Sequence, residues 1–135
     1  MVVENTETLA LHASEDVVRA RQIVRDWASR LGFGLVDQTK LVTAASELAR
    51  NTVQHGGGGR LRVEAIANGV RRGLQLTFED DGPGIPDVEL ALKDGYTTSS
   101  GLGLGLSGAR RLSNDFEITS RPGEGTRVRI ARWKG

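Results

Sequence analysis

The spacing of apolar residues in the first third of the chain predicts two amphipathic helices. Between residues 17 and 31 apolar side chains recur every three or four positions, and a second stripe of the same period covers residues 41–52. This spacing places the apolar side chains on one helical face, where they can pack against a core. Ser14 and Asp37 are candidate N-caps, because their side-chain oxygens can accept from free N–H groups of a first helical turn. The four glycines at 56–59 are expected to end the second helix.

From residue 60 onward the pattern changes to the alternation that is typical of strands. The segments 60–67 and 73–80 alternate apolar and polar residues, and Asn68 and Gly69 between them are a hairpin signal. A further short strand is expected at residues 8–12, ahead of the helices. These strands give the helices a sheet on which to pack.

The rest of the chain adds a loop, a helix and a hairpin. Residues 82–100 are polar and are expected to form a long loop, followed by a third helix near 104–114 and a last hairpin built from DFEITSR and TRVRIARW. Helices and strands are largely segregated along the chain, which favours an α+β fold. We expect a two-layer α/β sandwich, with a mixed, mostly antiparallel sheet and helices on one face. Residues 1–135 are expected to form one domain.

Composition narrows the function classes. Hydrophobic residues make up 38% and charged residues 26% of the chain, which is typical of globular proteins. The net charge of +1 and the six aromatic residues do not indicate a nucleic-acid surface. The chain has no cysteine, which excludes disulfides and thiolate metal sites. It also has no apolar run of membrane-spanning length and no signal-peptide pattern, so we expect a cytoplasmic protein.

The segment SSGLGLGLSGARRL, residues 99–112, raises the question of a phosphate site. Glycines let a backbone approach a ligand closely, and a glycine loop that opens a helix offers free N–H groups to a phosphate. Its last glycines match G-x-G-x-x-G, but no strand precedes them as a dinucleotide fold requires. No lysine follows at a distance suited to a large protein kinase or a P-loop.

Asp80 ends an apolar row. Leu74, Leu76 and Phe78 share its parity in the predicted strand, so its carboxylate should point toward the core. A buried carboxylate needs a donor. That donor is either a local N–H of the DGPG turn or an exocyclic amino group such as that of adenine.

Glu47 and Asn51 are four residues apart and therefore adjacent on one face of the second helix. An asparagine carbonyl oxygen can bind Mg²⁺, and a glutamate beside it can accept a proton. The spacing alone favours an ordinary solvated pair, so the chemistry depends on what lies around it.

Four motifs in order resemble the nucleotide site of the GHKL superfamily, which includes gyrase, Hsp90 and histidine kinases. They are E-x-x-x-N ending at Asn51, D-x-G-x-G from Asp80, G-x-G-x-G-L from Gly101, and GEGT ending at Thr126. The superfamily has the Bergerat fold, which agrees with the element order above. Residues 32–51, 79–87 and 94–112 are most similar to the switch kinases of the stressosome, and less so to the anti-sigma factor kinases.

The resemblance implies roles for individual residues. Asn51 would hold Mg²⁺ on the phosphates of ATP, and Glu47 would be the general base. Asp80 would accept from the adenine amino group, and Thr126 would place a hydroxyl near the same base. His55 could touch a phosphate or the lid, although its place at a helix end fits a surface residue better.

The glycines and the intervening loop complete the implied site. Gly82 and Gly84 would shape the floor of the pocket, and residues 85–100 would cover the nucleotide as a lid. The phosphates would be wrapped by Gly101, Gly103 and Gly105. Further phosphate contacts are open for these residues: Arg50, Thr97, Thr98, Ser99 and Ser100.

The function implied is that of an ATP- and Mg²⁺-dependent protein serine/threonine kinase. Its substrates would be STAS-domain proteins of the stressosome, and once released it would activate a PP2C-type phosphatase. Two alternatives remain open: an anti-sigma factor that holds a sigma factor, and a module that binds nucleotide without transferring phosphate. No nucleic-acid or membrane partner is implied.

Overall fold

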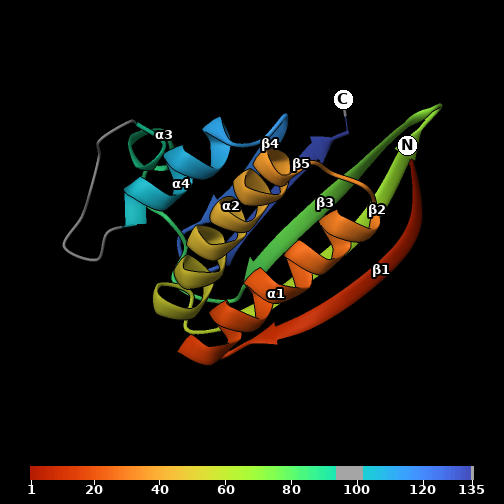
Figure 1. Cartoon of the computed structure of the whole chain (residues 1–135). Helices are drawn as coiled ribbons and strands as arrows, with labels where there is room; N and C mark the ends of the chain where they lie inside the picture. Colours follow the sequence, from red (N-terminus) through yellow and green to blue (C-terminus); the bar gives the residue numbers. More distant parts are fainter. Residues whose placement is uncertain (94–101, 135) are drawn as a thin grey trace.

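A single sheet covered on one face by helices is the frame of the molecule (Figure 1). The computed structural model describes residues 1–93 and 102–134, with the backbone alone described for 102–105. Within those residues the strands are β1 (Val2–Leu11), β2 (Gly59–Asn68), β3 (Arg71–Asp80), β4 (Asp115–Arg121) and β5 (Gly125–Trp133). The helices are α1 (Ser14–Arg30), α2 (Leu35–Gln54), the short α3 (Val88–Ala91) and α4 (Leu102–Arg111).

The strand order is β1-β2-β3-β5-β4, and each described pair of neighbours is antiparallel. The α+β fold class is therefore confirmed, whereas the expected mixed sheet is fully antiparallel in the described strands. The reason lies in the last hairpin. β4 enters at the edge in the same direction as β3, and β5 then folds back between the two, so the parallel strands are never neighbours.

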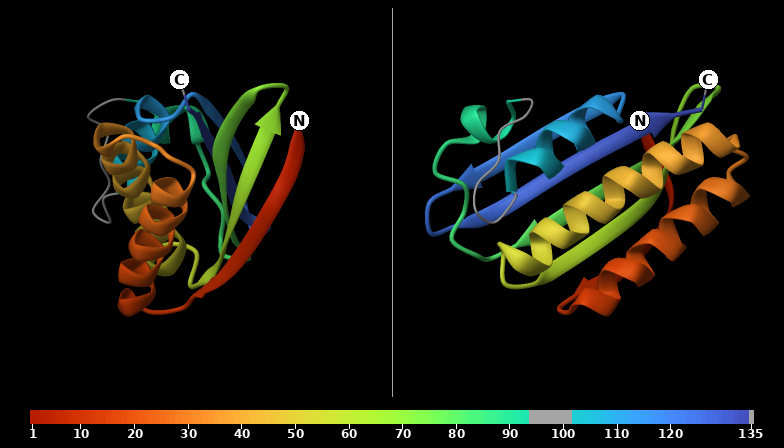
Figure 2. Two further views of the ribbon diagram at one scale, coloured as in Figure 1. Left: turned by 45° about the vertical axis from the view of Figure 1, so that its right-hand side comes forward. Right: turned by 60° about the vertical axis from the view of Figure 1, so that its left-hand side comes forward.

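The core lies between the inner face of the sheet and the helices, which lie side by side across it (Figure 2). The strands β2 and β3 are confirmed, and their predicted inward residues are buried in the middle of each strand, but the burial does not alternate, because Gln75 and Thr77 of the opposite parity are buried as well. The largest buried side chains include Leu41 and Leu48 of α2, and Leu61, Leu74, Leu76, Phe78 and Ile130 of the sheet. At the edge, the indole Nε1 of Trp27 donates to Glu7 of β1 at 2.6 Å and joins α1 to the outermost strand.

Several element boundaries differ from the sequence prediction. β1 begins at Val2 rather than at residue 8, because its exposed edge carries little of the alternation that marks a half-buried strand. The loop after β3 contains α3, whose N-cap Asp87 accepts from the N–H of Leu90 at 3.0 Å. α4 begins at Leu102, so the helix starts earlier than the glycine pattern suggested.

Both predicted N-caps are wrong. α1 is capped at Ala13, and the Asp16 carboxylate reaches back to accept from the N–H groups of His12 and Ala13 at 2.9 and 3.1 Å. These two hydrogen bonds lower the pKa of Asp16. α2 is capped at Gly34, which leaves Asp37 in the first turn with its carboxylate free for a tertiary contact.

That contact is with Arg132 of β5. Its Nε and Nη2 donate to Oδ1 of Asp37 at 3.1 and 2.8 Å, and its Nη1 donates to the carbonyl oxygen of Leu112 at 2.9 Å. The guanidinium thus joins the start of α2, the end of α4 and the last strand. Only 15% of the Arg132 side chain is exposed, so the pair is partly shielded from solvent.

We expect Arg132→Lys to lower the free energy of unfolding by about 1–2 kcal/mol, because an ammonium cannot reproduce the planar fork that satisfies both acceptors. Urea denaturation measures the change. Arg127→Lys is the matched control, since that side chain lies on the opposite face of the same strand. Equal stability of the two variants would show that Arg132 does not hold the helices to β5.

Candidate functional site

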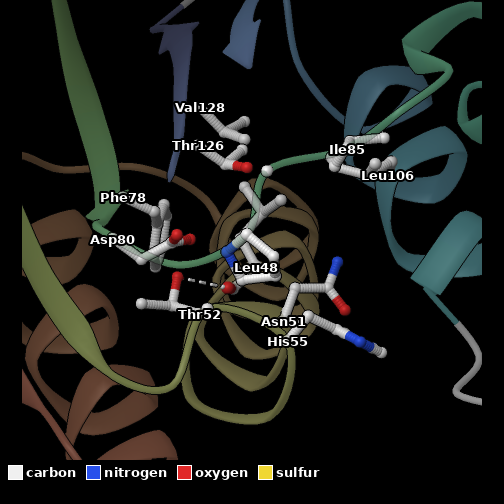
Figure 3. A pocket seen from close by; sticks show the side chains of 13 residues that line it. Leu48, Asn51, Thr52, His55, Phe78, Asp80, Ile85, Leu106, Thr126 and Val128 are labelled. Carbon is white, nitrogen blue, oxygen red and sulfur yellow. Dashed lines mark hydrogen bonds between the residues drawn. The ribbon is translucent and has the colours of Figure 1, made fainter. Parts of the chain in front are cut away.

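A cavity of about 130 Å³ lies between α2, β3, β5, the turn after β3 and α4 (Figure 3). This is close to the volume of an engineered cavity of about 150 Å³ that admits benzene, so one flat ring is the natural occupant. Its walls are mainly apolar, with a few polar groups at the ends. The lining residues are Leu48, Asn51, Thr52, His55, Gly56, Phe78, Asp80, Pro83, Gly84, Ile85, Leu106, Thr126 and Val128.

The cavity unites residues that are far apart in the sequence. Asn51, Asp80, Gly84 and Thr126 were predicted from three separate motifs, and all four line the cavity. Figure 3 shows Asn51 projecting from α2 on one side, with Asp80 and Thr126 on the strands facing it. The sequence motifs therefore converge in space as the nucleotide-site hypothesis requires.

The strand register places polar residues in one row at this end of the sheet. Asp80 of β3 is directly opposite Thr126 of β5, which is directly opposite Ser120 of β4. Side chains of opposite residues share a face of an antiparallel sheet. Asp80 therefore points to the helical side, as its parity predicted, and it lines the cavity beside Thr126.

Asp80 combines both interpretations that the sequence left open. Its Oδ1 accepts from the N–H of Gly82 at 2.9 Å, as in a local turn, while the side chain still lines the cavity. Burial raises the pKa of the Asp80 carboxyl, and the backbone hydrogen bonds from Gly82 and Thr126 partly offset that rise. The carboxylate is thus an under-solvated acceptor that gains from a further donor.

Close backbone approach around Asp80 requires glycine. A Cβ on Gly56 would lie 2.3 Å from Cγ of Asp80, and a Cβ on Gly82 would lie 2.6 Å from the carbonyl oxygen of Gly56. Gly84 has a φ of +79°, and its Cβ would lie 2.2 Å from the carbonyl oxygen of Arg121. Gly82 and Gly84 are therefore needed for the shape of this turn, of which Gly84 lines the cavity and Gly82 does not.

Asn51 and Glu47 have different surroundings. Asn51 lines the cavity, and among the described residues its buried Nδ2 has no hydrogen-bond partner. Glu47, one turn earlier, does not line the cavity, and 38% of its side chain is exposed. Its Oε1 accepts from Nη1 of Arg50 at 2.9 Å. The amide of Asn51 thus belongs to the cavity wall, and the carboxylate of Glu47 lies outside the cavity.

A divalent cation could bind at Asn51 only together with a ligand. No group of three or more histidine, cysteine, aspartate or glutamate side chains that could hold a metal ion occurs in the described ranges 1–93 and 102–134. Mg²⁺ commonly takes one or two protein oxygens and completes its shell with phosphates and waters. The carbonyl oxygen Oδ1 of Asn51 is the kind of ligand that this pattern requires, whereas its unpartnered Nδ2 is a donor suited to an acceptor such as a phosphate oxygen.

The phosphate-loop glycines are only partly described. Gly101 lies outside the described residues, as do Thr97, Thr98, Ser99 and Ser100. Gly103 and Gly105 lie in the first part of α4 rather than in a loop ahead of it. The N–H groups of a helix's first three residues have no intrahelical partner, so Gly103 keeps a free N–H, whereas the N–H of Gly105, the fourth residue of α4, points back along the helix.

Two further polar residues, His55 and Ser120, lie in or next to the site, and the sequence prediction included only the first of them. His55 is the C-cap of α2, as expected for the helix end, but it is half-buried, lines the cavity and has a buried Nε2 without a partner in the described part of the chain. Its spacing of four from Asn51 is the signal that places both on one helical face. Ser120 has the parity of Phe116 and Ile118, which could have marked it as Asp80 was marked.

Comparisons with known proteins give a consistent result. Residues 36–134 match the family described as histidine kinase-, DNA gyrase B- and HSP90-like ATPase. The chain is 47% identical over 118 residues to the serine/threonine-protein kinase RsbT of Bacillus subtilis (strain 168), covering 87% of this chain and 89% of that protein. It is 29% identical over 130 residues to an anti-sigma F factor of Thermoanaerobacter sp. (strain X514), covering 93% and 90%.

The structural comparison concerns the fold alone. The crystal structure of the RsbU and RsbW domains of Rv1364c from Mycobacterium tuberculosis matches 96% of this chain with a TM-score of 0.63 and 20% sequence identity. The chain spans 32% of that longer protein. In addition, none of the helices in the described residues is both long and apolar enough to span a membrane.

The raised pKa of Asp80 predicts how stability depends on pH. The folded protein keeps the proton of this carboxyl at pH values where the unfolded chain, with the ordinary value of 3.8, has lost it. The free energy of unfolding therefore falls as pH rises through this interval. Asn does not titrate, so we expect Asp80→Asn to gain stability relative to the wild type as pH rises from 3.8 toward neutrality.

Urea denaturation of both proteins at a series of pH values measures this difference. Asp26→Asn on the exposed surface of α1 is the control, because it removes a carboxyl that is not buried. A stability difference for Asp80→Asn that stays constant with pH, or that shrinks as pH rises, would contradict a desolvated carboxylate.

Proposed function

This chain belongs to the family of histidine kinase-, DNA gyrase B- and HSP90-like ATPases, and on that premise we propose that it is a switch kinase acting on STAS-domain proteins. It is a serine/threonine protein kinase that uses ATP and works through partner-switching interactions. The proposal adds the cation Mg²⁺, the STAS-domain substrate and a PP2C-type phosphatase that the released kinase activates. It also places the protein in the cytoplasm.

The observation that carries the proposal is the convergence of Asn51, Asp80 and Thr126 on one apolar cavity of about 130 Å³. The cavity would take the adenine ring between Leu48, Phe78 and Val128, and Asp80 would accept from its amino group. A hydrogen bond to a charged acceptor contributes roughly 1.5–3 kcal/mol. Burial of the ring between apolar walls adds affinity without adding specificity.

The phosphates would extend from the adenine toward Asn51 and the start of α4. Asn51 would offer its carbonyl oxygen to Mg²⁺, which supplies positive charge that neutralises the phosphate oxygens. The free N–H groups at the start of α4, that of Gly103 among them, would donate to the same phosphates. Phosphoryl transfer depends mainly on this positioning and charge neutralisation.

Glu47 would act on the protein substrate. Its carboxylate would take the proton from a serine or threonine hydroxyl as that oxygen forms a bond to the γ-phosphorus and the bond to the ADP oxygen breaks. The partial exposure of Glu47 supports this role, because a protein substrate must reach the base from solvent. Arg50, now paired with Oε1 of Glu47, would have to share or release that oxygen.

The decisive experiment combines radiolabelled ATP with a STAS-domain protein. We expect Glu47→Gln to reduce phosphate transfer by about 10²- to 10⁴-fold, the usual contribution of a general base, while ATP affinity changes little. Glu117→Gln is the control, because that carboxylate pairs with Arg129 on the face of the sheet away from the cavity. Transfer that persists unchanged in Glu47→Gln would remove the general-base role.

The same experiment separates the alternatives. A wild-type protein that binds ATP and transfers nothing would be a nucleotide-binding module. Capture of a sigma factor in preference to a STAS-domain protein, measured with both purified partners, would favour the anti-sigma alternative. The similarity to anti-sigma F factors is the observation that keeps this second function in view.

His55 supplies a further test of where the phosphates lie. Because its Nε2 is buried and unpartnered on the helical face of Asn51, we expect His55→Ala to weaken ATP binding up to about tenfold, the loss of one hydrogen bond. Adenosine binding should be unaffected, since it lacks phosphates. Calorimetry measures both, with His12→Ala as the control. An equal loss for adenosine and ATP would place His55 at the base instead.

A further inference from the structure

Ser120 lies directly behind the Thr126 hydroxyl, which would face the adenine ring in the proposed complex. It occupies the third position of the row Asp80, Thr126 and Ser120, on the strand beyond Thr126. Ser120 does not line the cavity, whereas Thr126 does, and Figure 3 shows the Thr126 hydroxyl oxygen on the cavity side. The two hydroxyl oxygens are 2.8 Å apart. Ser120 can therefore act on a ligand in the cavity through a neighbour that lines it, and Thr126 is the neighbour with a hydroxyl.

The hydrogen bonds of Ser120 restrict the direction of this contact. A serine hydroxyl has one proton to donate and two lone pairs to accept with. The N–H of Ile85 occupies one lone pair, with a distance of 2.7 Å. The Ser120 proton has two candidate acceptors, the carbonyl oxygen of Gly125 at 3.2 Å and Oγ1 of Thr126 at 2.8 Å.

The distances favour Thr126 as the acceptor. Hydroxyl-to-oxygen hydrogen bonds are typically about 2.7–2.8 Å, and 3.2 Å lies beyond the usual range. When Ser120 donates to Thr126, the proton of Thr126 is left to point into the cavity. The alternative, in which Thr126 donates to Ser120, would leave the Ser120 proton only the long contact to Gly125.

We propose that Ser120 is a positioning residue that makes the Thr126 hydroxyl a donor toward the bound base. The chain of donors runs from the Ile85 N–H to Ser120, to Thr126 and then to the ligand. Successive hydrogen bonds of this kind polarise one another. The inference rests on the proposed function, because it deepens how the cavity would recognise adenine.

This arrangement specifies the chemistry of the ligand edge. Asp80 requires a donor, and Thr126 beside it requires an acceptor. Adenine presents an exocyclic amino group next to the ring nitrogen N1, which is an acceptor. Guanine and hypoxanthine present a carbonyl oxygen and an N–H in the same places, so both contacts would be mismatched. The row therefore selects adenine through two adjacent groups of opposite polarity.

Calorimetry with ADP and 1-deaza-ADP, in which a C–H replaces N1, tests the assignment in the presence of magnesium. We expect the wild type to bind 1-deaza-ADP about five- to tenfold more weakly, the value of one hydrogen bond. In Thr126→Val, which has no hydroxyl to donate to N1, we expect the ratio of ADP affinity to 1-deaza-ADP affinity to approach one, and this value is the lower limit for the other variants. In Ser120→Ala we expect this ratio to fall below half of its wild-type value, because Thr126 loses the partner that orients it.

Ser120→Thr keeps a hydroxyl at this position and should restore the ratio, which a loss of strand packing would not allow. Ser113→Ala is the control for removing a serine hydroxyl, since Ser113 donates to the carbonyl oxygen of Ala109 away from the row. A ratio in Ser120→Ala equal to that of the wild type would overturn the inference and leave the proposed function intact. Absence of ADP binding by the wild type would overturn both.

Discussion

The partly desolvated carboxylate of Asp80 is the constraint around which this end of the molecule is arranged. A carboxylate at the end of an apolar row is costly unless donors reach it. The chain meets that requirement by bringing backbone to the carboxylate, with the Gly82 N–H at 2.9 Å and Gly56 packed against the side chain. Side chains at Gly56, Gly82 or Gly125 would prevent this approach, because their Cβ atoms would fall within 2.6 Å of neighbouring atoms.

At this end of the sheet an apolar cavity lies close to a carboxylate, that of Glu47, which is outside it. The apolar interior of the cavity favours a flat ring and strengthens each polar contact by excluding water. Glu47 lies outside this interior, partly exposed and paired with Arg50. The proposed mechanism requires this division, since the nucleotide would be enclosed while Glu47 would remain accessible to a side chain of the partner.

Period and parity in the sequence were sufficient for the fold class, for the core strands and for the inward direction of Asp80. They failed where a residue is determined by tertiary contacts. Asp37 has the local properties of an N-cap, yet Arg132, 95 residues away, takes its carboxylate. The resemblance carried by the ordered motifs predicted that Asn51, Asp80 and Thr126 would lie together, and all three line one cavity. Ser120 was not predicted, because a serine near the end of an alternating strand carries no local sign of the Ile85 N–H and the Thr126 hydroxyl that the fold brings to it.

The contact between Asp37 and Arg132 joins the two elements that carry opposite walls of the cavity, α2 and β5. Arg132 lies near the end of β5, and the same strand begins beside the cavity at Thr126; Asp37 lies at the start of α2, and the same helix carries Asn51 and His55 toward its other end. The ion pair resists sliding of α2 along β5, because it joins the ends of both elements that lie away from the cavity. It thereby helps to keep Asn51 and His55 in register with Thr126 across the cavity.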